Sequence, residues 1–186
     1  MTAYREISST ILKELGQVLS QVEVAEADRL VSELLEAKKV FIFAVGRVFL
    51  ALQCLGKRLG HLGIDCQVVG AINEKPIAPG DLMLIASGSG ESKLPAEIAR
   101  IAKSKGARLG LITAATNSTI KDMSDFAVHL SCPTKHDSSS GARSIQAMST
   151  LFDQSLHIFG DVVSLMIQTR KGLKSEELWQ NHANLE

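Results

Sequence analysis

Five short apolar runs, most of them separated by segments of helical length, constrain the fold more than any other feature of the sequence. The runs are "KVFIFAVG" (39–46), "IDCQVVG" (64–70), "DLMLIAS" (81–87), "ARLGLIT" (107–113) and "FAVHLS" (126–131). Most are rich in β-branched or aromatic residues, as strands buried on both faces are. The segments between them predict helices over 48–62, 93–105 and 118–124. This alternation predicts an α/β fold with a doubly wound, five-stranded parallel sheet flanked by helices.

Further helices are predicted on both sides of this core. Apolar residues recur at spacings of three and four over 7–22 and over 25–35, ahead of the first strand. After the last strand a serine-rich loop, "KHDSSSGAR", leads to a long helix from about 144 to 168, and "SEELWQNHANLE" predicts a final one. With no internal repeat and no interdomain linker, residues 1–186 are expected to form a single domain with N-terminal helices and a C-terminal helical tail.

Charge and hydropathy exclude several classes of partner. Twenty acidic and twenty basic side chains give a formal net charge of zero, so neither nucleic acid nor an anionic membrane is expected as a partner. No apolar stretch approaches the roughly 18 residues needed to span a bilayer. The three cysteines, Cys54, Cys66 and Cys132, are odd in number and lack CxxC spacing, which does not describe a disulfide framework. These features favour a soluble, cytoplasmic protein.

Two glycine-containing loops, "AVGRV" and "ASGSGES", follow the first and third predicted strands. In a sheet of order 2-1-3-4-5 the winding reverses between these strands, and ligands bind at such a point. Ser87, Ser89 and Ser92 offer hydroxyls there, the backbone at Gly88 and Gly90 can approach a ligand closely, and the next helix offers its N-terminus. The loop therefore predicts a small-anion site, the alternative being an ordinary tight turn with a helix cap.

The same loop fits a nucleotide poorly. A P-loop ends in Gly-Lys-Ser/Thr, whereas this loop continues Glu91-Ser92-Lys93. The third glycine of a dinucleotide fingerprint would fall on Lys93, and no acid ends "LGLIT" to hold a ribose. The expected ligand is a phosphate group that does not belong to a nucleotide.

Four segments carry a resemblance to a known family. "GDLMLIASGSGESK", with "RLGHLG" before it, "QAMSTLFDQS" after it and "HANLE" at the end, resembles the 6-phospho-3-hexuloisomerases of the sugar isomerase (SIS) domain superfamily over nearly the whole chain. The resemblance implies a five-stranded parallel sheet and homotetramers built from dimers. It also implies interconversion of 3-hexulose 6-phosphate and fructose 6-phosphate with no cofactor and no metal.

The resemblance assigns a phosphate-binding set. Its members are Gly46, Arg47, Arg58, Ser87, Gly88, Ser89 and Ser92. The two arginines would offset substrate charge, although each also fits a solvated or structural ion pair. Where the family has Ser and Gly after the first arginine, this chain has Val48 and Phe49, which removes a hydroxyl and adds a ring beside the expected crevice.

Asp153 is the predicted general base. Moving a carbonyl between adjacent carbons passes through an enediol(ate) and needs a group that takes and returns a proton. Asp153 stands in "TLFDQ" where the family usually has Glu, so the carboxylate is kept on a side chain that is one methylene shorter. The alternative is an acid that complements the N-terminal dipole of a helix.

His182 is the second catalytic candidate. It matches the histidine of the family's terminal motif, and in the wider superfamily such a histidine, supplied by a neighbouring subunit, helps to open the sugar ring. The resemblance thus implies a homo-oligomer, dimer or tetramer, with sites at subunit interfaces; the alternative is a frayed terminal residue. His61 is a weaker ligand contact, and Glu91 is either a helix-capping acid, which we favour, or a further site carboxylate.

Three alternatives remain open from the sequence. A metal site of Cys132, His136 and Asp137 is the weakest, because three residues in one loop without further ligand spacing fit solvated loop chemistry better. A sugar-phosphate-binding protein without catalysis, or an isomerase for a different phosphosugar, is favoured by Val48, Phe49 and Asp153. A structural assembly protein would need no phosphate loop.

Overall fold

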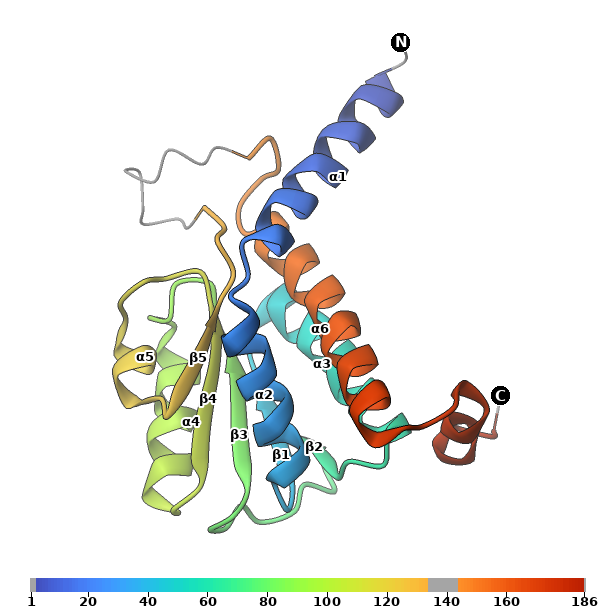
Figure 1. Ribbon diagram of the computed structural model, residues 1–186. Coiled ribbons are helices and arrows are strands. Elements are labelled where there is room, and N and C mark those ends of the chain that lie inside the picture. Colours follow the sequence, from blue (N-terminus) through green and yellow to red (C-terminus); the bar gives the residue numbers. More distant parts are fainter. Residues whose placement is uncertain (1–2, 134–143, 186) are drawn as a thin grey trace.

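The computed structural model describes residues 3–133 and 144–185, and within these residues five strands form one parallel sheet (Figure 1). The strands are β1 (Val40–Phe43), β2 (Cys66–Val68), β3 (Leu82–Ala86), β4 (Arg108–Thr113) and β5 (Phe126–His129). Their order is β2-β1-β3-β4-β5, and every neighbouring pair is parallel. The predicted doubly wound parallel sheet is confirmed, and in this order the winding reverses between β1 and β3.

Alternate residues of the central strands face two separate cores, which is the reason for their continuous apolar sequence. Val40 and Ile42 of β1 pack with α1 (Ala3–Ser20), α2 (Val24–Glu36), α3 (Gly46–His61) and α6 (Thr150–Lys171). Phe41 and Phe43 pack on the other face with α4 (Lys93–Ser104) and α5 (Thr119–Met123). Because helices cover both faces of the sheet, the strand ends are held in place, and they fix the positions of the loops that follow them.

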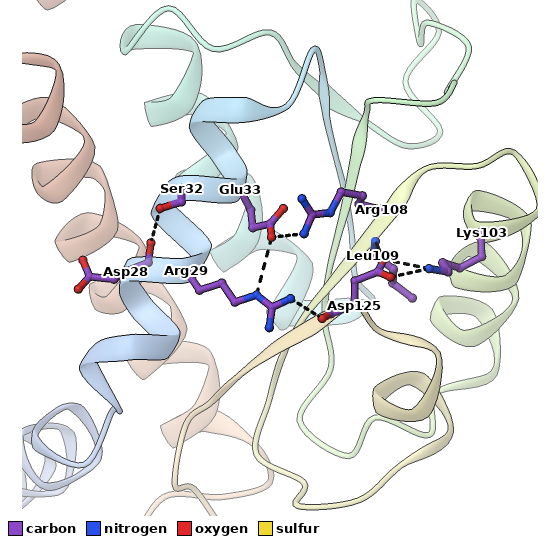
Figure 2. Close-up of polar contacts among 8 residues, drawn as sticks. All are labelled: Asp28, Arg29, Ser32, Glu33, Lys103, Arg108, Leu109 and Asp125. Atoms are coloured by element: carbon purple, nitrogen blue, oxygen red, sulfur yellow. Dashed lines mark hydrogen bonds and ion pairs between the residues drawn. The ribbon is translucent and has the colours of Figure 1, made fainter.

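Ion pairs join α2 to the amino end of β4. Glu33 of α2 is buried and accepts a hydrogen bond from Arg108, the first residue of β4 (Figure 2). Arg29, one turn earlier, pairs with the same Glu33 oxygen at 3.7 Å and donates to the backbone carbonyl of Asp125 at 2.7 Å. A carboxylate this buried is stable only with such partners.

Asp125 extends this network to α4. Its carboxylate accepts from Lys103 at 2.8 and 2.9 Å and from the Leu109 N–H at 2.7 Å (Figure 2). Burial alone would raise the pKa of Asp125, but the hydrogen bonds from Lys103 and Leu109 and the nearby charges of Lys103 and Arg108 lower it below its usual value. The amino ends of β4 and β5 are thereby tied to helices on both faces of the sheet.

Two predicted helices differ from the structure. The long helix begins at Thr150 rather than near 144, because Met148 adopts a left-handed conformation (φ 57°) and Ser144 to Gln146 are bonded to α1 instead. The final helix is a short 3₁₀ helix, η1 (Ser175–Asn181), and no helix is formed over 182–185. At the start of the long helix, hydrogen bonds to α1 outweigh the helical sequence pattern. At the final helix, no residue of η1 is buried, so little packing supports a longer helix.

The N-terminal helix is buried along only part of its length. Leu15 and Val18 of α1 enter the core, whereas Tyr4 and Ile7 are exposed on the part of the helix that extends away from the sheet (Figure 1). Within the described residues, no helix is both long and apolar enough to cross a membrane.

Candidate active site

A cavity of about 440 Å³ opens at the carboxyl ends of β1 and β3. It is formed by the loops that follow these two strands and by the start of α6. The side chains and backbone that line it belong to Val45, Gly46, Arg47, Val48, Ala86, Ser87, Gly88, Ser89, Ser92, Ala114, Pro133, Met148, Ser149, Thr150, Phe152 and Asp153. The two loops predicted to flank one crevice do so, and they share it with the predicted base.

The serine loop after β3 is preorganised by its own hydrogen bonds. Ser87 Oγ accepts from the Gly90 N–H at 3.1 Å and lies 3.5 Å from Ser92 Oγ, while Ser89 Oγ accepts from the Glu91 N–H at 3.2 Å. Ser92 stands at the N-cap of α4 without capping it through its side chain. Three hydroxyls thus line the cavity near the first turn of a helix, where backbone N–H groups lack intrahelical partners, and this combination suits an anion.

Gly90 allows the loop to turn this sharply. Its φ is +64°, a conformation that residues with a side chain rarely adopt. A Cβ atom built on Gly90 would lie 2.0 Å from Ser118 Oγ and 2.5 Å from Ser118 Cβ. The close packing of the loop against the start of α5 therefore requires glycine.

Glu91 has the capping role favoured from sequence, although the helix that it caps is α5 and not α4. Its carboxylate accepts from the Thr119 N–H at 2.7 Å and from Thr119 Oγ1 at 2.8 Å. It does not line the cavity. Glu91 ties the serine loop to a neighbouring helix through these bonds.

Arg47 and Asp153 both line the cavity and contact each other. Arg47 Nε donates to Asp153 Oδ2 at 3.0 Å, which joins the N-terminus of α3 to the first turn of α6. The Asp153 side chain is 6% exposed, and its Oδ1 has no hydrogen-bond partner among the described residues. The Arg47 side chain is 67% exposed. A buried carboxylate with one incompletely paired oxygen costs stability, which is typical of a functional site.

The two substitutions after Arg47 have different consequences. Val48 lines the cavity, so the loss of a hydroxyl predicted there affects the site directly. The Phe49 ring packs against Phe43, with 5.4 Å between ring centroids, and does not line the cavity. The ring that Phe49 adds after Arg47 therefore belongs to the apolar packing of β1 and not to the cavity lining.

Arg58, His61 and His182 meet in a second cavity of about 490 Å³, between α3, α6 and η1. The rings of His61 and His182 stack with 5.0 Å between centroids, and Arg58 Nη1 lies 3.3 Å from His61 Nδ1. His61 is buried, and its Nε2 has no partner among the residues that the structure covers. Burial, together with the nearby charges of Arg58, Lys57 and His182, lowers the pKa of His61, so its imidazole is neutral at neutral pH.

The predicted site residues therefore fall into two groups within one chain. The two cavities share no lining residue. Along α3, His61 lies about 21 Å from Arg47 at a rise of about 1.5 Å per residue. Arg47 contacts Asp153 and His61 contacts His182, so the two predicted catalytic residues are far apart in the monomer.

The structure offers no support for the alternative metal site. His136 and Asp137 lie outside the described residues, and among those described no group of three or more His, Cys, Asp or Glu side chains is placed to hold a metal. Cys132 is buried beside Ser155, with 3.9 Å between Sγ and Oγ, and burial raises its pKa to about 11.

Sequence reasoning missed part of the cavity wall. Met148, Ser149 and Thr150 line the cavity immediately before Asp153, in the segment "AMST". Two hydroxyls one turn ahead of a candidate base were a usable signal. The sequence pattern nevertheless places them inside a helix. Glycine usually marks a left-handed turn, and the turn before this helix has Met148 instead.

Comparison with known proteins gives full-length relatives. A Bacillus subtilis (strain 168) protein named 3-hexulose-6-phosphate isomerase is 35% identical over 181 residues, covering 97% of this chain and 98% of its own. A Mycobacterium gastri protein of the same name is 31% identical over 96% of this chain and 89% of its own. A crystal structure from Methanococcus jannaschii, for which a molecular function of 3-hexulose-6-phosphate isomerase was inferred, has a TM-score of 0.82 at 27% identity and covers 98% of this chain and 99% of that one.

The family match covers all five strands and every residue that lines the first cavity. Residues 33–158, from the end of α2 into α6, match the SIS domain family. This range includes the serine loop, Arg47 and Asp153, whereas His182 lies beyond it. The chain therefore belongs to the SIS domain family and, within it, to the group of relatives named 3-hexulose-6-phosphate isomerase.

Proposed function

We propose that this protein is a phosphosugar isomerase that interconverts 3-hexulose 6-phosphate and fructose 6-phosphate. The observation that carries the proposal is a single cavity that combines three serine hydroxyls near a helix N-terminus with a buried carboxylate, Asp153. Its volume of about 440 Å³ is in the range of small-ligand sites. The names of the full-length relatives support the same substrate pair.

In this proposal the serine loop binds the phosphate group. Hydroxyls of Ser87, Ser89 and Ser92 and N–H groups at the start of α4 donate hydrogen bonds to its oxygens, and Gly46 and Gly88 allow close approach of the backbone. Arg47 adds a positive charge at the rim of the cavity. Binding through the phosphate fixes the sugar carbons relative to Asp153.

Asp153 acts as the base that moves the proton. It takes the proton from C2 of the 3-ketose, and the C2–C3 enediolate forms as the C3 carbonyl accepts the electron pair. The same proton then returns to C3, while the C2 hydroxyl passes its own proton to the C3 oxygen, so that the carbonyl stands at C2 and a hydroxyl at C3. One carboxylate thus serves both proton transfers. Arg47 holds Asp153 Oδ2 in place, and Asp153 Oδ1, which has no hydrogen-bond partner among the described residues, carries the proton.

His182 serves the site of a neighbouring subunit in this proposal. It lies far from Asp153 of its own chain, yet it is held by stacking on His61 and contact with Trp179 rather than left frayed. An imidazole that approaches the cavity of a second copy would assist ring opening of the sugar, with Arg58 beside it. The site then requires a homo-oligomer, for which we propose a homotetramer built from dimers. We further propose a cytoplasmic location, in keeping with three cysteines that are all unpaired.

A coupled assay tests the proposal. Purified protein receives 3-hexulose 6-phosphate in the presence of EDTA, and formation of fructose 6-phosphate is followed against a control without enzyme. Turnover that persists in EDTA is expected. Folded protein that binds fructose 6-phosphate without turnover would instead indicate a sugar-phosphate-binding protein, and protein that neither binds nor reacts would point to a different phosphosugar or to a structural role.

A further inference from the structure

Glu14 of α1 is hydrogen-bonded to the segment that leads into α6. Its carboxylate accepts from the Ser144 hydroxyl at 2.8 Å, from the Ile145 N–H at 2.9 Å and from Gln146 Nε2 at 3.0 Å. Burial alone would raise the pKa of Glu14, but these three hydrogen bonds lower it below its usual value. The carboxylate is therefore ionised at neutral pH, and its hydrogen bonds are charge-assisted.

The segment fixed by Glu14 contains a strained residue. Met148 has a φ of 57°, and a residue with a side chain keeps such a conformation only where its surroundings hold it. The Met148 side chain is 84% exposed, so its own packing does not hold it. On one side the segment is held by Glu14. On the other it joins the first turn of α6, where the Thr150 N–H donates to the Ala147 carbonyl at 3.2 Å and the Asp153 N–H donates to the Ser149 carbonyl at 3.0 Å.

The strained segment is also a wall of the candidate active site. Met148, Ser149 and Thr150 line the same cavity as the serine loop and Asp153. Figure 1 shows the segment passing beside α1 before it enters α6. Through the Glu14 side chain, α1, which contributes no lining residue to the cavity, is thus bonded to residues 144–146, which lead directly into this wall.

We infer that Glu14 is a positioning residue of the active site, which holds residues 144–146 so that Met148, Ser149 and Thr150 form the wall against which the sugar phosphate binds. The inference rests on the proposed function. A wall that contacts the sugar away from the reacting carbons binds ground state and transition state alike. Its displacement therefore raises KM and leaves kcat nearly unchanged, in contrast to the loss of the base.

The test compares Glu14→Ala and Glu14→Gln with a control, Glu6→Gln. Glu6 lies on the same helix and is exposed, and within the described part of the chain its carboxylate makes no hydrogen bond or ion pair. For each protein we would measure KM and kcat for 3-hexulose 6-phosphate, the Kd for fructose 6-phosphate, the thermal midpoint, and hydrogen exchange at the Ile145 and Thr150 amides. Glu14→Gln keeps an amide oxygen as acceptor and guards against a misfolded alanine variant.

Glu14→Ala is expected to raise KM and Kd about tenfold with kcat within about twofold of the wild type, and Glu14→Gln to raise them less. Amide exchange at Ile145 and Thr150 should be faster in both, while Glu6→Gln matches the wild type. Unchanged KM and Kd in an active enzyme, or unchanged exchange, would overturn the inference alone. A wild-type protein that neither binds nor converts the sugar phosphates would overturn the proposed function and this inference together.

Discussion

The Arg47 guanidinium and the Asp153 carboxylate are joined by a 3.0 Å hydrogen bond between two helices that are far apart in the sequence. The Asp153 carboxylate is almost fully buried, and the Arg47 side chain is largely exposed. Asp153 is therefore held inside the protein by the helix that carries it, and its partner lies at the rim of the cavity.

Replacement of Asp153 by Asn should separate catalysis from binding. An amide of the same shape keeps the packing but cannot accept the proton, so kcat is expected to fall by about 10²–10⁴-fold, while the Kd for fructose 6-phosphate changes by less than about threefold. Steady-state kinetics and calorimetric titration measure the two quantities. Asp122→Asn, which neutralises an exposed acid on α5, serves as the control. Full activity in Asp153→Asn would remove it from the mechanism.

Mixing two inactive variants should restore activity if Asp153 and His182 of different subunits share a site. In a random mixture of Asp153→Asn and His182→Ala chains, about a quarter of the sites receive both intact residues, whether the assembly is a dimer or a tetramer. The expected activity of the mixture is therefore about a quarter of the wild-type value, measured after joint refolding or co-expression. Each variant alone stays inactive. A mixture that is also inactive would contradict the shared site.

Gly90→Ala should damage both the fold and the phosphate site. Strain at positive φ costs about 1 kcal/mol, and the contact of the new Cβ with Ser118 adds to it, for a total of about 2–4 kcal/mol. The matched control is Gly70→Ala, where φ is +88° but nothing lies within 4 Å of the added carbon. Denaturant unfolding and fructose 6-phosphate titration check the two effects. Equal losses in both variants would mean that the contact with Ser118 is relieved at little cost.

Asp125→Asn should reduce stability in a pH-dependent way. The pKa of Asp125 is lower in the folded protein than in the unfolded chain, so its carboxylate stabilises the fold above the unfolded pKa, near 4, and this contribution is lost as pH falls through the folded value. Because the side chain is partly exposed, the loss at pH 7 is expected to be about 1 kcal/mol. Urea unfolding at pH 7 and pH 3 measures it, and the variant and wild type should differ less at the lower pH. Asp28→Asn, in the exposed pair with Arg170, is the control.

The fold was predictable because its central strands, β1 and β3, are buried on both faces. A continuous apolar run such as Val40–Phe43 is typical of a strand that is covered on both faces. The helices between successive strands indicate that the strands are parallel. The helix start at Thr150 was not predictable, since it depends on hydrogen bonds from Ser144 and Ile145 to Glu14, a residue far away in the sequence.

The site was predictable in composition and less so in geometry. The serine loop and Asp153 were found from the motifs, and they do share a cavity. The placement of the Phe49 ring against Phe43 depends on side-chain packing that a sequence does not encode locally. The stacking of His182 on His61 likewise required the path of the chain after α6.

The ion pairs of Glu33, Arg108 and Asp125 lie at the amino ends of the strands, and the cavity lies at their carboxyl ends. The polar contacts that stabilise the fold and the residues that line the cavity are therefore at opposite ends of one sheet. Substitutions in this network can therefore change the stability of the fold without replacing any residue that lines the cavity.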